Sequence, residues 1–310
     1  MKILLAGYYG FGNLGDELLA QTARELLSAK HTVTVCRARR NFLFLLLPAD
    51  CLLLAGGSLF QDVTGRGLSV LYYSAWACAA KLFRKKLFLV AQGIGPIRAP
   101  LNRWLTRAVF RRADFVSLRD RESAEFLGLP QSHLTADLLF AAKLRTLKTA
   151  QRQQAKTAPL PVGAARRRQA RAARRRQIIV NLKKSAPQIL TEFQPVYLAM
   201  QPSADWGRPC APPDFAAARL AVGMRLHFLI LAVLHNVPAV GIAYDPKVEN
   251  FCRKFDLPYV TLDELERLPQ IIRRELAKPA AAKKRLAVLV KQERRLAREG
   301  VKVLLEKLNG

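Results

Sequence analysis

Acidic residues are scarce in this chain of 310 residues, which has 23 Asp and Glu against 51 Lys and Arg and a formal net charge of +28. No acidic residue occurs between Asp137 and Glu192, a stretch that contains fourteen Lys and Arg. Such an imbalance predicts affinity for polyanions, but it does not choose among nucleic acid, anionic lipid headgroups and phosphorylated substrates.

Cysteines are few, and their pattern excludes the usual metal motifs. The five cysteines are odd in number, scattered and without CxxC spacing: Cys36, Cys51, Cys78, Cys210 and Cys252. This pattern predicts a reduced, cytoplasmic chain without a bound metal. Long hydrophobic runs are lacking as well, since the run over 42–47 ends at Pro48, far short of the roughly 20 residues that span a bilayer. Residues 1–7 have no leading basic cluster, so we expect a first strand there rather than a signal peptide.

Short apolar runs alternate with helical patterns through the first part of the chain. Strands are expected over 2–6, 52–55 and 86–91, which are almost wholly apolar, and each leads into a glycine-containing loop. The alternation predicts a parallel, doubly wound α/β sheet, whose ligands bind at the carboxyl ends of the strands. A second series begins near 178, with strands expected over 178–182, 196–201 and 238–243 and no clear element over 202–214.

Composition divides the chain into three parts. We expect a first Rossmann-like domain over 1–142, a basic flexible linker or insert over 143–177, and a shortened second domain over 178–310 that ends in a long basic helix. The basic segment lacks interleaved aromatic residues and any nucleic-acid motif, so no specific nucleic-acid partner is expected. A solvated linker is the favoured interpretation, with non-specific attraction to an anionic surface as the alternative.

A glycine-rich loop between the first strand and the first helix is the strongest local signal for a ligand site. Glycines allow close approach of the backbone, and the helix start behind them offers free N–H groups and a positive dipole end. The substrate-binding candidates in this loop are Gly10, Gly12, Asn13, Gly15, Asp16 and Glu17. The alternative is a tight structural turn in which the two acidic residues cap the helix.

Two further positions have side chains suited to catalysis. Asp62 ends a second glycine turn, where it could act as a general base or, equally well, as a helix cap. Arg225 and His227 lie at the mouth of a buried helix expected within 221–233. A guanidinium could clamp a phosphate or carboxylate, and an imidazole could transfer a proton near neutral pH. Lys247, in a polar loop after the next strand, could contact a diphosphate.

Seven short blocks together resemble the polysaccharide pyruvyl transferase family, of the CsaB type. The blocks follow the family's order: Gly7–Glu17, Gly57–Asp62, Gln92–Pro96, Arg119–Ser123, Thr135–Asp137, Gly223–His227 and Gly241–Val248. The resemblance implies a glycosyltransferase-B-like architecture with two Rossmann-like domains facing across a cleft. It also implies that Arg225, Leu226 and His227 lie at the substrate site and that Lys247 contacts the diphosphate of the acceptor.

The resemblance further implies ketal pyruvyl transfer without a cofactor. Phosphoenolpyruvate is the implied donor, and the implied acceptor is a lipid-linked or nucleotide-linked glycan precursor of the cell envelope, a polymer that surface-layer proteins then bind. We expect His227 to act as the acid–base group and Arg225 as the anion clamp, with Asp16, Glu17 or Asp62 as a second acid–base group. A basic surface predicts peripheral contact with an anionic membrane. The alternatives are a nucleotide-sugar glycosyltransferase of the same fold and a degraded, non-catalytic polyanion-binding member.

Overall fold

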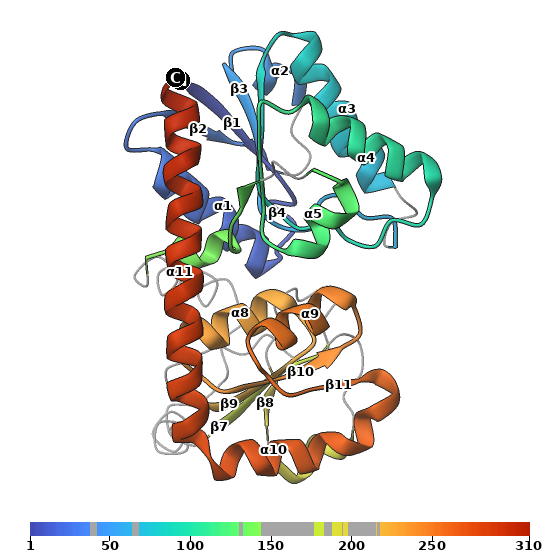
Figure 1. Cartoon of the computed structure of the whole chain (residues 1–310), viewed down its shortest axis with the longest axis vertical. Helices are drawn as coiled ribbons and strands as arrows, with labels where there is room; N and C mark the ends of the chain where they lie inside the picture. The colour runs from blue at the N-terminus through green and yellow to red at the C-terminus, as the bar shows by residue number, and fades with distance from the viewer. Residues whose placement is uncertain are drawn as a thin grey trace, which may run out of the picture. The chain divides into compact units, whose positions relative to one another are not determined.

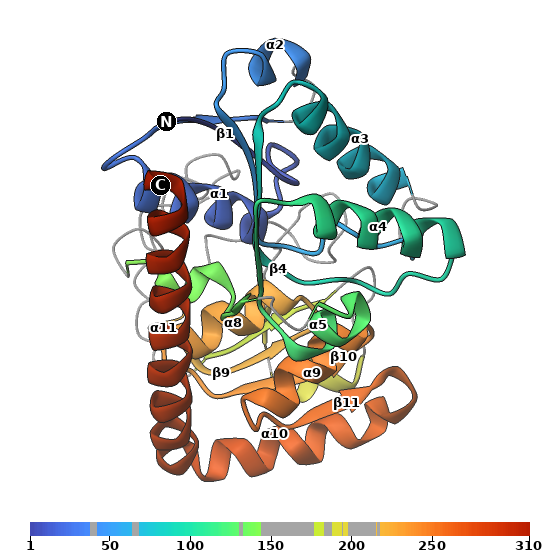
Figure 2. The same ribbon diagram turned by 45° about the horizontal axis from the view of Figure 1, so that its top comes forward.

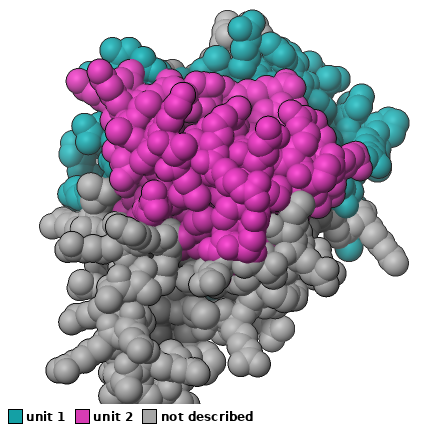
Figure 3. All heavy atoms as spheres, turned by 90° about the horizontal axis from the view of Figure 1, so that it is seen from below, with its two compact units in different colours: residues 1–146, 292–310 teal, residues 147–291 magenta. Residues whose placement is uncertain are grey.

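The computed structural model describes residues 1–37, 42–63, 68–129, 133–143, 177–182, 188–193, 195–197, 215 and 218–310. The chain forms two compact units (Figure 3). Unit 1 comprises Met1–Thr146 and Gln292–Gly310, and unit 2 comprises Leu147–Lys291. Most of the basic segment expected over 143–177 lies outside the described residues, so its character as a linker remains a prediction.

Unit 1 is built on a six-stranded parallel sheet. Its strands are β1 (Lys2–Ala6), β2 (Thr32–Val35), β3 (Cys51–Ala55), β4 (Lys86–Gln92), β5 (Phe115–Leu118) and β6 (His133–Leu134), in the order β2-β1-β3-β4-β5-β6. Strand β3 is buried along its whole length. The continuous apolar runs of the sequence are therefore strands covered on both faces, as parallel sheets require.

Helices cover both faces of this sheet. They are α1 (Leu14–Leu27), α2 (Phe42–Leu46), α3 (Leu68–Leu82), α4 (Pro100–Arg112) and α5 (Arg121–Leu127), with a 3₁₀ helix η2 (Leu138–Ala141). The connection from β1 to β2 runs in one direction across the sheet, whereas those from β2 to β5 run in the other. Right-handed crossovers therefore place α1 on one face and α2, α3 and α4 on the opposite face, as Figure 1 shows.

Unit 2 contains a five-stranded parallel sheet with the order β11-β10-β9-β7-β8. Its strands are β7 (Gln177–Asn181), β8 (Val196–Tyr197), β9 (Ala218–Gly223), β10 (Ala239–Ala243) and β11 (Tyr259–Thr261). Its helices are η4 (Gln188–Phe193), α8 (Leu226–Leu234), α9 (Pro246–Lys254), η6 (Leu262–Arg267) and α10 (Leu268–Ala277), followed by α11 (Pro279–Asn309).

Strand β9 corrects the sequence-based expectation for this unit. The sequence predicted no strand just before residue 222, yet β9 pairs with both β7 and β10 and is the central strand of the second sheet. The run is short and rich in alanine, which has a low strand propensity, and its register against β7 shifts at the start. Burial between two neighbouring strands outweighs the weak local preference.

Helix α11 also departs from the expected division of the chain. Its part from Gln292 onward belongs to unit 1, although the sequence placed it with the second domain. The hydroxyl of Thr135 donates a hydrogen bond of 3.1 Å to the carbonyl oxygen of Leu296. Gly300 packs so closely on Thr135 that a Cβ there would overlap the hydroxyl. Among the described helices, α11 included, none is both long and apolar enough to cross a membrane.

Candidate active site

The first glycine-rich loop is closed by side chains of the helix that follows it. Asn13 is the N-cap of α1, where its Oδ1 accepts a hydrogen bond of 3.2 Å from the amide of Gly15. The carboxylate of Glu17 accepts a bond of 2.5 Å from the amide of Gly10. Gly10 and Gly12 both have positive φ angles, +84° and +74°, which glycine adopts without strain. These contacts fix the loop conformation. The Glu17 carboxylate accepts from the Gly10 amide, which is therefore not available to a bound anion.

Buried polar groups join this loop to the second glycine turn. The hydroxyl of Tyr9 donates a hydrogen bond of 2.8 Å to the carbonyl oxygen of Ala55, at the end of β3. Burial, followed by the neighbouring Asp16 carboxylate, raises the pKa of Tyr9 well above its ordinary value. Asp16 is buried, and its Oδ1 lies 3.4 Å from the position that a Cβ on Gly57 would take. The two loops are neighbours because β1 and β3 pair directly.

Asp62 makes the contacts of a helix cap. Its carboxylate accepts hydrogen bonds of 2.8 to 2.9 Å from the amides of Arg98 and Ala99, just before α4, and a longer one of 3.4 Å from the side chain of Asn102. Partial burial would raise its pKa, but these hydrogen bonds from Ala99, Arg98 and Asn102 hold it below the ordinary value. The contacts favour the capping alternative, and general-base catalysis by Asp62 remains a prediction.

Replacing Asp62 by alanine is expected to lower the stability of unit 1 by about 1 kcal/mol at pH 7, the usual cost of a lost cap. Because the folded-state pKa lies below the unfolded value of about 3.9, this contribution is complete above that value and is lost as the pH falls through the folded pKa. Urea unfolding of the wild type and the alanine variant measures this effect. The difference between their free energies of unfolding should shrink below about pH 4. Replacement of Asp263, exposed in the first turn of η6, is the control for the loss of a surface carboxylate.

Arg119 is a buried cation that joins the carboxyl ends of four strands, and the sequence analysis gave it no role. Its guanidinium lies 3.1 Å from a carboxylate oxygen of Asp137 and donates a hydrogen bond of 2.9 Å to the hydroxyl of Ser58. A third contact, of 3.4 Å, reaches Asp120. Gly93 lies so close to the guanidinium that no side chain fits there. Four of the seven sequence blocks therefore meet at one side chain.

In unit 2, Arg225 and His227 lie where β9 passes into α8. Arg225 is the N-cap residue of α8, and Leu226 is its first residue and is buried. Every residue of α8 is buried except His227, which is half-buried with its Nε2 atom inside the protein. The first turn contains no acidic residue. A guanidinium, an imidazole and the positive end of a helix therefore meet at one edge of the sheet, an arrangement that attracts anions.

Lys247 lies at the same edge of the sheet. The sequence placed it in a polar loop, but it is the second residue of α9, which follows β10. Strand β10 pairs with β9 so that Gly241 is opposite Gly223. Its ammonium group forms an ion pair of 3.0 Å with Asp245, and Asp245 also caps α9 by accepting from the amide of Lys247 at 3.1 Å. The pair holds the lysine in place. The cleft between two facing domains that the family resemblance implies stays a prediction.

Asn181 is a further polar residue at this edge that the sequence analysis missed. It ends β7, is fully buried and lies opposite Gly223 in the register of β7 and β9. Its backbone carbonyl oxygen accepts a hydrogen bond of 3.0 Å from the backbone amide of Met224, directly before Arg225. The signal in the sequence was an asparagine at the end of an apolar strand. Within the described residues, no group of three or more His, Cys, Asp and Glu side chains could hold a metal ion.

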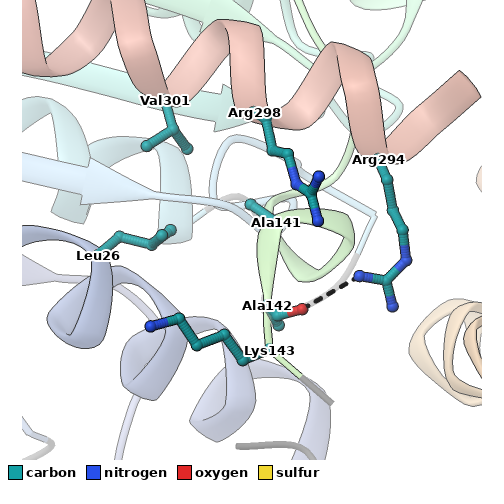
Figure 4. Close-up of a pocket in the computed structure, with 7 residues that line it drawn as sticks. All are labelled: Leu26, Ala141, Ala142, Lys143, Arg294, Arg298 and Val301. Atoms are coloured by element: carbon teal, nitrogen blue, oxygen red, sulfur yellow. Dashed lines mark hydrogen bonds between the residues drawn. The ribbon is translucent and has the colours of Figure 1, made fainter. Parts of the chain in front are cut away.

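A separate cationic pocket of about 500 Å³ lies in unit 1 (Figure 4). It is lined by Leu26, Ala141, Ala142, Lys143, Arg294, Arg298 and Val301, and no acidic side chain is among these residues. Arg294 donates a hydrogen bond of 3.3 Å to the carbonyl oxygen of Ala142. Burial, and then the neighbouring Arg298, lowers the pKa of Arg294. Like charges therefore repel each other on this face of α11.

Replacing Arg298 by glutamate is expected to stabilise the protein by about 1 kcal/mol. The change converts two like-charged pairs four residues apart, with Arg294 and with Lys302, into opposite-charged pairs. The unfolding midpoint temperature of the variant should be higher than that of the wild type. In 1 M salt, which screens surface charges, it should fall back toward the wild-type value. Arg295 is the matched control, since it already pairs with Glu299 at 3.6 Å and the same replacement should give no gain. An equal gain from both variants would contradict the explanation.

Comparison with known proteins identifies the class to which this arrangement belongs. The structure is similar to Anabaena HepE in complex with UDP and glucose, with 14% sequence identity, coverage of 100% of this chain and 99% of that chain, and a TM-score of 0.56. It is similar to UDP-GlcNAc 2-epimerase from Neisseria meningitidis bound to UDP-GlcNAc, with 10% identity, coverage of 99% of both chains and a TM-score of 0.55. These likenesses show an α/β fold of the glycosyltransferase-B-like type, with two Rossmann-like units. No curated protein sequence matches.

The particular family is shown by the sequence itself. The model of the family described as "Polysaccharide pyruvyl transferase" matches residues 13–193 and 214–246, more than half of the chain. The chain belongs to the polysaccharide pyruvyl transferase family. The second matched range contains Arg225 and His227, and the first begins at the N-cap of α1.

Proposed function

We propose that this protein transfers a pyruvyl group from phosphoenolpyruvate to a sugar of a cell-envelope polysaccharide precursor, forming a ketal and releasing phosphate. Membership of the family supports a transferase that acts on polysaccharide. The observation that carries the finer proposal is the placement of Arg225, His227 and Lys247 at the carboxyl edge of the second sheet. A guanidinium suits the phosphate or carboxylate of the donor, and an imidazole suits a proton transfer.

The chemistry assigns a task to each of these groups. Protonation of the methylene carbon of phosphoenolpyruvate makes it a methyl group and leaves an electron-poor carbon at C2. One sugar hydroxyl attacks C2 and loses its proton. A second hydroxyl of the same sugar attacks as the bond between C2 and the phosphate oxygen breaks, and its proton leaves with phosphate or solvent. In this proposal His227 moves the protons, Arg225 holds the anion and Lys247 contacts the diphosphate of the acceptor.

The acceptor in this proposal is a lipid- or nucleotide-diphosphate-linked glycan. Solved structures of similar fold hold UDP or UDP-GlcNAc, which supports a diphosphate-linked partner. The same likeness favours one alternative, a nucleotide-sugar glycosyltransferase. We place the protein in the cytoplasm, in peripheral contact with an anionic membrane, on the strength of its net charge of +28 and the location of lipid-linked acceptors.

Incubation of the protein with phosphoenolpyruvate and a panel of diphosphate-linked sugars tests the proposal. The expected result is release of inorganic phosphate together with an acceptor that gains the mass of a pyruvyl ketal. Release of UDP from a nucleotide sugar, without consumption of phosphoenolpyruvate, would instead support the glycosyltransferase. A folded protein that binds polyanions and turns over neither substrate would support the non-catalytic alternative.

A further inference from the structure

Helix α3 is apolar on both faces, which is unusual for a helix at the surface. Its inner face packs on the sheet through buried residues such as Val70 and Trp76. Its outer face exposes Leu68, with 63% of its surface accessible, and Leu82, with 79%. Lys81 is the only charged residue among the fifteen of this helix. A helix that is hydrophobic all round is normally covered on both sides, so its outer face calls for a partner.

The two neighbouring helices also expose apolar side chains. Phe42 of α2 stacks on Trp76 of α3 with 3.7 Å between the ring centroids. Helices α3 and α4 lie side by side in both ribbon views (Figures 1 and 2). We call the exposed side chains of these three helices the α2–α4 surface, and its principal members are Phe44, Leu68, Leu71, Tyr72, Leu82 and Trp104. Exposed apolar patches of this kind mark sites of protein or membrane contact.

Helices α3 and α4 contain basic residues and no acidic one, and Lys81 of α3 is ion-paired with Asp114, just after α4. Residues 63–113, which include α3 and α4, contain no Asp or Glu and ten Lys and Arg. Arg103 and Arg111 are exposed on α4, the helix that contains Trp104. Apolar and aromatic side chains surrounded by basic residues match the interface of an anionic bilayer, where the apolar groups enter the headgroup region and the cations meet lipid phosphates.

We propose that the α2–α4 surface docks the protein on an anionic phospholipid bilayer. The ten positive charges of this region oppose its pairing with a second copy of the same surface. Single-stranded nucleic acid would need aromatic rings on which bases can stack, whereas leucine supplies half of the principal members. The inference rests on the part of the proposed function that includes membrane contact. Its test measures vesicle binding and not pyruvyl transfer, so a failure of membrane docking can be told apart from a failure of the proposed enzymatic activity.

The test compares variants of the full chain by flotation with vesicles. Wild-type protein is expected to bind vesicles of phosphatidylcholine with phosphatidylglycerol and to bind pure phosphatidylcholine far less. The variant L71S/L82S/W104S should lose at least about tenfold in partitioning, because each side chain would lose its apolar burial in the interface. Leu262 and Val288 are exposed to a similar degree in unit 2, with 51% and 56% of their surfaces accessible. The control variant L262S/V288S should bind as wild type.

Replacement of Arg111 by glutamine should weaken binding about fivefold, with a matching loss of salt dependence. Thermal unfolding verifies that each variant is folded, as expected for changes at exposed positions. Wild-type binding by the folded triple-serine variant would overturn the inference. So would loss of binding when Arg166, Arg167 and Arg168 are replaced by glutamine while the triple-serine variant still binds, since docking would then lie in the basic segment. A dimer that the triple-serine variant dissociates, without a change in vesicle binding, would assign the surface to a second copy.

Discussion

Replacing His227 by asparagine is expected to lower the rate of pyruvyl transfer by about 10² to 10⁴, the usual contribution of a positioned acid–base group. The imidazole is the one half-buried side chain of an otherwise buried helix, so asparagine fits there without disturbing the core. Steady-state release of phosphate from phosphoenolpyruvate measures the effect. The matched control is His235 at the other end of α8, where the ring stacks on Phe215 and its Nδ1 contacts the carbonyl oxygen of Leu231 at 2.8 Å.

Replacing Arg225 by glutamine should act on the same assay for a different reason. Loss of a charge-assisted hydrogen bond to the donor anion is expected to reduce kcat/KM by about 10- to 100-fold. Lysine at this position should recover part of the loss, because it restores the charge without the planar pair of donors. Arg219, exposed on β9 six residues earlier, is the control for surface charge. Near-normal transfer by the variants at both 225 and 227 would end the assignment of the site.

Replacing Arg119 by methionine is expected to destabilise unit 1 by about 3 to 5 kcal/mol. The guanidinium and Asp137 are both buried, with 7% and 5% of their surfaces accessible, so the variant would lose a buried ion pair while the Asp137 carboxylate stays buried. Urea unfolding followed by tryptophan fluorescence measures the loss, since Trp76 and Trp104 both lie in unit 1.

Arg121 is a demanding control for this prediction. It lies two residues further on and forms an ion pair with Glu125 at 2.9 Å, but 83% of its side chain is exposed. An exposed pair of this kind contributes little because water screens it, so its replacement by methionine should cost less than about 0.5 kcal/mol. Equal losses at 119 and 121 would show that the effect comes from the loop and not from the buried pair.

Elements with a strong apolar period could be predicted from the sequence almost to the residue. The run over 2–6 is β1, and those over 52–55 and 86–91 are β3 and β4, each with a difference of one residue at one end. Such elements are specified by their own side chains. Strand β9 could not be predicted in the same way, because its stability comes from pairing with β7 and β10 on either side.

In the candidate site, too, the residue types could be predicted from the local sequence, whereas contacts between distant residues could not. The residue types at 225, 227 and 247 were visible in the sequence, and the structure places all three at one edge because β9 and β10 are neighbours. The partners of Asp62, by contrast, lie 36 to 40 positions away, so its capping role could not be separated from a catalytic one. Arg119 was overlooked for a similar reason, since its partner Ser58 is 61 positions away.

The division of α11 between the two units affects how this protein can be taken apart. A fragment that stops at Thr146 would leave Thr135 without the backbone of Leu296 and Gly300 that covers it. We therefore expect such a fragment to need the peptide Gln292–Gly310, supplied in trans or grafted through a short loop, before it folds well. Removal of residues 292–310 from the full chain would likewise destabilise the N-terminal part, because both segments belong to unit 1.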